Sequence, residues 1–119
     1  MKVSDYITNF LIERGIKKCF SVTGGFSMHF NDSFGEKFDV TYTHGAALGW
    51  SSYEHNPSVC CVTSGCGATN ATTPCLIAYQ DSVPVLFISG QVQRNDNIRS
   101  RGGGDRGYFG SDCDIVECV

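Results

Sequence analysis

One stretch of the sequence decides the fold: Val59-Cys60-Cys61-Val62-Thr63-Ser64-Gly65-Cys66-Gly67-Ala68-Thr69-Asn70. Its first half is nearly all apolar, which is typical of a strand that is buried on both faces, as in a parallel sheet. Cys60 and Cys61 would then point to opposite faces, where buried thiols pack as small apolar side chains. The second half carries glycines and small residues, which predicts a tight turn that leads into a helix. The stretch therefore predicts a strand, turn and helix of an α/β fold.

The same alternation continues on both sides of this stretch. The expected strands span 19–23, 40–42, 59–63 and 84–89, and the expected helices cover 3–11 and 28–34, continue onward from 45 and run up to 79. We expect Ser4 to cap the first helix and Gly15 to end it in a left-handed conformation. Strands that alternate with helices predict a layered α/β/α fold with a mostly parallel sheet and right-handed crossovers. Ligands of such sheets bind beyond the carboxyl ends of the strands.

Length and composition predict one folded domain. The chain has 119 residues, of which 41% are apolar and 18% are charged, and its net charge is −3. This composition is globular, and the acidic balance excludes an electrostatic attraction to nucleic acid or to an anionic membrane. We expect an α/β core at 1–91, a flexible Gly/Arg/Asp-rich segment at 92–113 and an apolar docking tail at 114–119. The basic residues of the middle segment, Arg94, Arg99, Arg101 and Arg106, favour a solvated loop, and a phosphate-binding loop is the alternative.

The cysteines and the hydropathy pattern bear on the compartment. No apolar run approaches the roughly 20 residues that cross a bilayer, so no membrane association is expected. The sequence starts directly in an amphipathic pattern, without the apolar core of a signal peptide. The seven cysteines are therefore interpreted as reduced thiols of a cytoplasmic protein. Their spacing contains no CxxC pair, which argues against a zinc site.

Three kinds of chemistry can be assigned to the turns of this pattern. Gly65 and Gly67, with Asn70 behind them, form a candidate anion cradle at a helix N-terminus, although a plain tight turn explains them as well. Asn70 stands where a dinucleotide fingerprint needs its third glycine, which disfavours a nicotinamide or flavin site. Cys66 is a candidate nucleophile, because a helix dipole favours the thiolate, but it needs a histidine as base. His44 follows a strand, where it could act as a general acid or base or cap the turn.

Several segments, in order, resemble the N-terminal pyrimidine-binding domain of thiamine diphosphate enzymes of the acetolactate synthase type. The matching segments are Val3-Ser4-Asp5-Tyr6-Ile7 through Gly15-Ile16-Lys17, Val22-Thr23-Gly24-Gly25, Met28-His29-Phe30-Asn31-Asp32-Ser33-Phe34-Gly35, Val62 through Asn70, Gln80 through Gln91, and Asp114-Ile115-Val116-Glu117. The resemblance covers nearly the whole chain and is most specific at Val62 through Asn70. It implies a thiamine diphosphate Pyr-domain-like fold.

The resemblance also implies a site and partners. Such a domain grips the aminopyrimidine of thiamine diphosphate, while a second domain, usually on the partner subunit, holds the diphosphate through Mg²⁺. The residues that it points to for cofactor binding are Gly24, Gly25, Thr43, His44, Gly65, Cys66, Gly67, Thr69, Asn70 and Gln80. The family forms dimers through the helices that follow the strands, so a homodimer is expected. A separate diphosphate-binding subunit and a module that keeps only the fold remain the alternatives.

The sequence departs from the family pattern at positions that matter for catalysis. Thr43 and His44 occupy the place of the glutamate that activates the cofactor, and Cys66 stands where proline is common. Ser111-Asp112 replaces a typical Gln-Glu pair, and the GDG signature of the diphosphate-binding domain does not occur. The chain also ends before the family's first domain would be complete. We therefore expect an incomplete domain, 1–119, that is degenerate and not catalytic alone, with Mg²⁺ bound only if a partner supplies the second domain.

Overall fold

The computed structural model describes residues 1–43 and 45–91. In chain order its elements are α1 (Val3–Glu13), β1 (Lys18–Val22), the short 3-10 helix η1 (Gly25–Ser27), α2 (Met28–Lys37), β2 (Asp39–Tyr42), α3 (Ala46–Glu54), β3 (Ser58–Val62), α4 (Cys66–Gln80) and β4 (Val85–Ser89). The alternation predicted from the sequence is thereby confirmed. His44, the segment 92–113 and the tail 114–119 lie outside the described residues.

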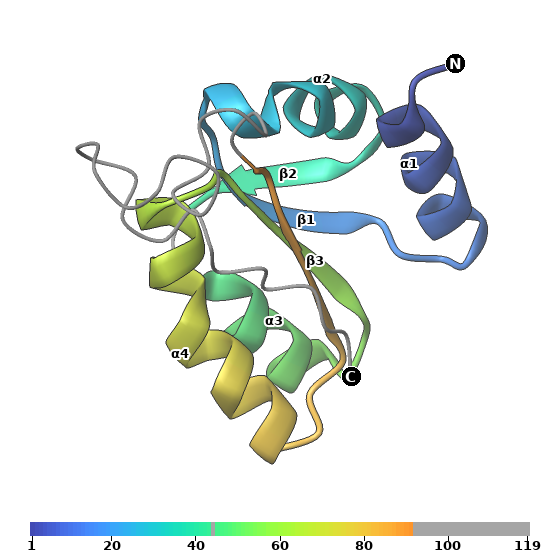
Figure 1. Ribbon diagram of the computed structural model, residues 1–119. Helices are drawn as coiled ribbons and strands as arrows, with labels where there is room; N and C mark the ends of the chain where they lie inside the picture. The colour runs from blue at the N-terminus through green and yellow to red at the C-terminus, as the bar shows by residue number, and fades with distance from the viewer. Residues whose placement is uncertain (44, 92–119) are drawn as a thin grey trace, which may run out of the picture.

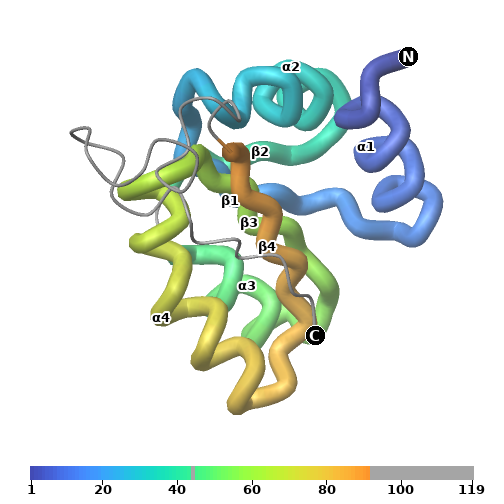
Figure 2. The backbone as a smooth tube through the Cα atoms, viewed as in Figure 1, coloured from blue at the N-terminus to red at the C-terminus, as the bar shows by residue number. Residues whose placement is uncertain are grey.

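The four strands form one parallel sheet in the order β2-β1-β3-β4. Lys18 pairs with Asp39 across β1 and β2, and Cys19 pairs with Val59 across β1 and β3. Helices α1 and α2 lie on one face of the sheet and α3 and α4 on the other (Figure 1), and the tube in Figure 2 shows the same two helical layers around the strands. The fold is a layered α/β/α structure, as predicted.

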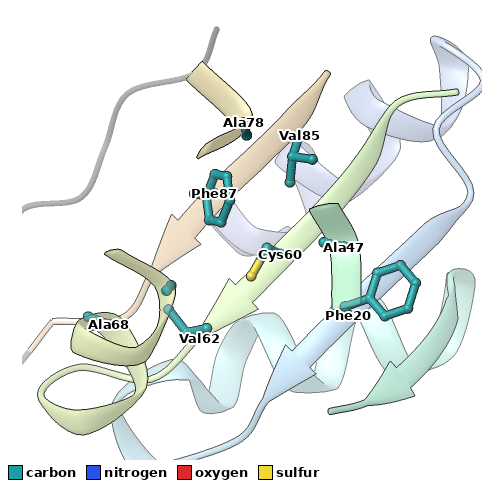
Figure 3. Packing of buried hydrophobic residues seen from close by; sticks show 9 residues of the cluster. Phe20, Ala47, Cys60, Val62, Ala68, Ala78, Val85 and Phe87 are labelled. Carbon is teal, nitrogen blue, oxygen red and sulfur yellow. The ribbon is translucent and has the colours of Figure 1, made fainter. Parts of the chain in front are cut away.

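Two apolar clusters fill the space between the sheet and its helical layers. The cluster under α3 and α4 contains Phe20, Ala47, Cys60, Val62, Ala68, Ala71, Ala78, Val85 and Phe87, most of which Figure 3 labels. The cluster under α1 and α2 contains Leu11, Cys19, Phe34, Phe38, Val59 and Cys61. Cys60 and Cys61 therefore face opposite layers, as the pleat of a strand requires. Every residue of β3 is buried, which makes this strand the centre of the domain.

The contact between α1 and α2 corrects one expectation. Helix α1 begins at Val3 with Lys2 as its N-cap, so Ser4 is not the cap. The side chain of Ser4 is buried, and its hydroxyl lies 2.8 Å from the hydroxyl of Ser33 on α2. Ser33 Oγ also donates to the Asp5 carboxylate at 2.7 Å, and this hydrogen bond lowers the pKa of Asp5. Gly15 does adopt the predicted left-handed conformation after α1, with φ of 80°.

No helix in the described part of the chain is both long enough and apolar enough to span a lipid bilayer.

The buried thiols predict a loss of stability at alkaline pH. Burial raises the pKa of Cys60 to about 11, from an ordinary value of 9.0. Between pH 9 and 11 the unfolded chain therefore loses this proton while the folded chain keeps it. The contribution of the buried thiol to the free energy of unfolding is thus full below pH 9 and declines above it. We expect wild type to lose more stability than Cys60→Ala between pH 8 and pH 10, by on the order of 1 kcal/mol, in urea unfolding. Equal losses in the two proteins would contradict this prediction.

Candidate functional site

The carboxyl ends of all four strands meet at one edge of the sheet. The turns that leave this edge start at Thr23 after β1, Thr43 after β2, Thr63 after β3 and Gly90 after β4. Since β1 lies between β2 and β3, the chain leaves β1 towards α2 on one face and β3 towards α4 on the other. In open α/β sheets this point, where the strand order reverses, is where ligands bind. A ligand site is therefore expected at the turns after β1 and β3.

Thr63 joins these two turns by close contact with two glycines. A Cβ added to Gly24 would lie 2.6 Å from Thr63 Cβ and 2.7 Å from Thr63 Cγ2. A Cβ added to Gly67 would lie 2.9 Å from the same Cγ2. The backbone N–H of Thr63 donates to Val22 O at 3.0 Å, which fixes the start of its turn on β1. The absence of a side chain at both glycines is what lets the two turns come together.

The start of α4 exposes polar backbone groups at this edge. Gly65 is the N-cap residue, with φ of 67°, and has no side chain to cap the first turn of the helix. Both the N–H and the hydroxyl of Thr69 donate to Gly65 O, at 2.9 and 3.0 Å. The preceding N–H groups of the first turn have no helical partner, and they lie at the positive end of the helix dipole. The geometry that an anion cradle requires is therefore present, while the hydroxyl proton of Thr69 is already used within the turn.

The turn after β2 lies at the same edge and packs against α4. Thr43 is half-buried, and its N–H donates to Ser21 O at 3.2 Å. Gly45 has φ of 64°, and a Cβ there would lie 3.5 Å from Pro74 Cγ in the middle of α4. Thr43 thus lies at the carboxyl edge, beside the end of β1. Its hydroxyl does not ionise near neutral pH, so it cannot exchange a proton as a carboxylate does.

Cys66 has no base beside it in the part of the chain that the structure describes. The thiol is exposed at the first residue of α4, and no hydrogen bond there joins it to a histidine. His29 lines a hollow with Lys2 and Ser4 at the start of α1, and His55 ends α3 at the opposite edge of the sheet. The two described histidines are therefore both accounted for elsewhere, and the thiol-nucleophile hypothesis gains nothing from the geometry.

Gln80 lies far from the other candidates. It is the last residue of α4, fourteen positions after Cys66, which places it about 21 Å along the helix axis. Helix α4 connects two parallel strands and therefore runs back to the amino edge of the sheet, taking Gln80 with it. The structure brings together at the carboxyl edge Gly24, Gly25, Thr43, Gly65, Cys66, Gly67, Thr69 and Asn70. Gln80 therefore lies apart from this group, and nothing in its position supports a role at the carboxyl edge.

Gly90 is a residue of this edge that the sequence reasoning missed. Its N–H donates to Val62 O at 2.8 Å, and a Cβ there would lie 2.6 Å from the carbonyl carbon of Phe26 and 2.9 Å from the nitrogen of Ser27. The turn after β4 therefore packs closely against η1. A glycine directly after a buried strand was the available signal, because it marks a close approach of two backbones.

A metal site has no support from the described side chains. Within residues 1–43 and 45–91 there is no group of three or more histidine, cysteine or carboxylate side chains that could hold a metal ion.

Comparison with known proteins gives concordant results from sequence and structure. The family model "Thiamine pyrophosphate enzyme, N-terminal TPP binding domain" matches residues 1–118. The acetolactate synthase large subunit of Buchnera aphidicola subsp. Acyrthosiphon pisum is 35% identical over an alignment of 98 residues, and the match covers 75% of this chain and 17% of that protein. The chloroplastic acetolactate synthase of Arabidopsis thaliana is 32% identical over an alignment of 101 residues, and the match covers 78% of this chain and 15% of that protein. The chain thus spans less than a fifth of these relatives.

Solved structures share the fold at low sequence identity. Benzoylformate decarboxylase from Polynucleobacter necessarius superposes with a TM-score of 0.70 at 21% identity, covering 92% of this chain and 21% of that one. A putative thiamin diphosphate-dependent enzyme from Mycobacterium smegmatis superposes with a TM-score of 0.73 at 20% identity, covering 98% and 23%. At this level of identity the superpositions show the fold alone.

Proposed function

Because the chain belongs to the family of thiamine pyrophosphate enzyme N-terminal TPP-binding domains, we propose that its carboxyl edge binds the aminopyrimidine of this cofactor, also called thiamine diphosphate. The observation that supports the proposal is the contact of Thr63 with Gly24 and Gly67, which draws two turns together at the point where the strand order reverses. Such close backbone approach beside an uncapped helix N-terminus is typical of sites that use main-chain groups to hold a polar ligand.

The residues at this edge fit a flat heteroaromatic ring with hydrogen-bonding groups. Asn70 is exposed in the first turns of α4, and its amide can both donate and accept. Gly25 has open space where its Cβ would be, so a ligand can approach the backbone there. Gly65 and Cys66 present the backbone at the start of α4. We assign to these groups the role of binding and orienting the ring, with Thr43 at the margin.

We further propose that this chain does not catalyse the family's reactions alone. Bound thiamine diphosphate supplies a carbon nucleophile for carbonyl substrates once a proton has been removed from it. Thr43 stands where the family pattern has the glutamate that assists this step, and its hydroxyl cannot take that role at neutral pH. Among the described residues no three histidine, cysteine or carboxylate side chains lie together as a metal site would need. Cofactor binding at this edge would therefore be weak and would need a second domain to become productive.

The binding proposal is tested by two matched variants on one helix. Asn70 and Gln80 are both exposed amides on α4, one at each end, so neither change disturbs the core. We expect Asn70→Asp or Asn70→Ala to weaken binding of thiamine diphosphate by roughly 3- to 10-fold in titration calorimetry, as the loss of one hydrogen bond implies. Gln80→Ala should leave the affinity unchanged. Equal affinities of wild type and the Asn70 variants would contradict the proposed placement of the ring.

A second candidate function is one half of a split enzyme, either in a homodimer or with a separate diphosphate-binding subunit. The observation that favours an associating surface is the set of large apolar side chains left exposed on α3 and α4, namely Tyr53, Leu76, Ile77 and Tyr79. Large apolar side chains that lie together on a surface mark interaction sites. The split enzyme would be supported if acetolactate forms only when the chain is mixed with a diphosphate-binding chain. If the mixture stays inactive, the function that remains is cofactor binding without catalysis.

A further inference from the structure

A hollow lies at the amino edge of the sheet, at the opposite end from the proposed cofactor edge. Its volume is about 380 Å³, and it is lined by Gly15, Lys17, Lys18, Asp39, Trp50, Asn56 and Pro57. These residues come from the turn before β1 and its first residue, the start of β2, the middle of α3 and the turn before β3. The volume falls within the range of small-molecule sites, which starts at about 300 Å³. We call it the Trp50 hollow.

The aromatic wall of this hollow is held in place from behind. Trp50 is the single tryptophan of the sequence and is half-buried on α3. Its ring lies 6.3 Å from the ring of Phe20, centroid to centroid, at an interplanar angle of 54°. Phe20 itself is buried in the core. Because one side of the indole packs against the core, the side chain is already held in place. A planar ring can therefore contact its remaining surface without a further loss of side-chain entropy.

The charged wall carries one uncompensated positive charge. Lys18 Nζ lies 2.7 Å from the Asp39 carboxylate and 5.5 Å above the ring of Phe20, so its charge is paired and its position is fixed. Lys17 is exposed and takes part in no ion pair within the described residues. The hollow thus combines an aromatic wall, a free ammonium group and the exposed amide of Asn56.

We propose that the Trp50 hollow binds a planar aromatic or heteroaromatic molecule that bears a phosphate or carboxylate group. The ring lies against the indole, the anionic group pairs with Lys17, and the Asn56 amide donates to and accepts from the edge of the ring. The paired Asp39 carboxylate restricts where an anion can lie, which directs the anionic group to the Lys17 side. This site is separate from the carboxyl edge and does not depend on thiamine diphosphate binding there.

The single tryptophan gives a direct measurement. The protein labelled with ¹⁵N has one indole N–H signal, that of Trp50, which can be followed while adenosine monophosphate is added as the probe. We expect the signal to shift and saturate at millimolar or lower concentration. Adenosine, which lacks the charge, should bind at least 5-fold more weakly, and ribose 5-phosphate, which lacks the ring, should leave the signal in place. No saturable shift up to about 10 mM probe, or equal binding of adenosine and the monophosphate, would overturn the proposal.

Two lysine variants separate a specific site from a general charge effect. Lys17→Ala should weaken binding of the monophosphate at least 5-fold. Lys37→Ala removes the same charge from α2, where Lys37 Nζ donates to Asn9 Oδ1 at 2.6 Å, and should leave the binding unchanged. Equal effects of the two variants would overturn the assignment. The same titration on Asn70→Ala should match wild type, so a failure of the cofactor edge and a failure of the Trp50 hollow are distinguishable.

Discussion

Gly90→Ala is expected to destabilise the protein by about 3 kcal/mol or more, or to prevent it from folding. The added Cβ would lie 2.6 Å from the carbonyl carbon of Phe26 and 2.9 Å from the nitrogen of Ser27, both of which are backbone atoms. Neither the turn after β4 nor η1 can shift easily to relieve this overlap. Gly90 N donates to Val62 O at 2.8 Å, and Ser27 N donates to Gly24 O at 3.1 Å, so both segments are fixed by hydrogen bonds. The measurement is urea unfolding followed by circular dichroism.

The matched control for this experiment is Gly35→Ala. Gly35 lies in the interior of α2, and an added Cβ would meet no atom within 4 Å. Because alanine has the higher helix propensity, this variant should gain up to about 1 kcal/mol of stability. An unfolding midpoint of Gly90→Ala equal to that of wild type would show that η1 and the end of β4 are not in the contact described.

Gly24→Ala is expected to cost about 2 to 3 kcal/mol and to weaken cofactor binding as well. The added Cβ would overlap Thr63, whose Cβ and Cγ2 would lie at 2.6 and 2.7 Å. Threonine is stiff at χ1 because it is branched at Cβ, so relief requires a shift of the turn after β3. That shift moves the start of α4, where the proposed ligand groups lie.

A double-mutant cycle tests whether Thr63 is the cause. Thr63→Ala removes Oγ1 and Cγ2, two of the three atoms that crowd the new Cβ, so part of the cost of Gly24→Ala should disappear in the double variant. We expect a coupling energy of at least about 1 kcal/mol in urea unfolding, as for residues in contact. Strictly additive effects would contradict the close contact of the two turns.

Local sequence patterns were sufficient for the elements of this fold. The apolar run at Val59–Val62 is fully buried, with Cys60 and Cys61 facing opposite layers, because β3 is central and covered on both faces. Ser4 shows the limit of such reasoning. It has the composition of a helix cap, yet Ser33, 29 positions away, sets its surroundings through a 2.8 Å contact that only the packing of α1 on α2 creates.

The candidate site was predictable only in part for the same reason. Gly24, Gly65 and Gly67 follow strands, and a parallel sheet places such residues at one edge. Gln80 was grouped with them by motif, although the predicted helix before it already carries the chain to the other edge. The roles of Thr63 and Gly90 depend on contacts between turns that are far apart in sequence, which no local pattern contains.

The carboxyl edge of the sheet is proposed to recognise thiamine diphosphate. Thermal unfolding of the purified chain with and without thiamine diphosphate and Mg²⁺ tests it most directly. A ligand at free concentration c stabilises the folded state by RT ln(1 + c/Kd), which is about 0.4 kcal/mol when the ligand is present at its dissociation constant and about 2.7 kcal/mol at about 100 times that concentration. We expect the cofactor to raise the midpoint of wild type and of Gln80→Ala by the same amount, and to raise that of Asn70→Ala by less. An unchanged midpoint at millimolar cofactor would contradict it and would mean that the chain has kept the fold without the binding site.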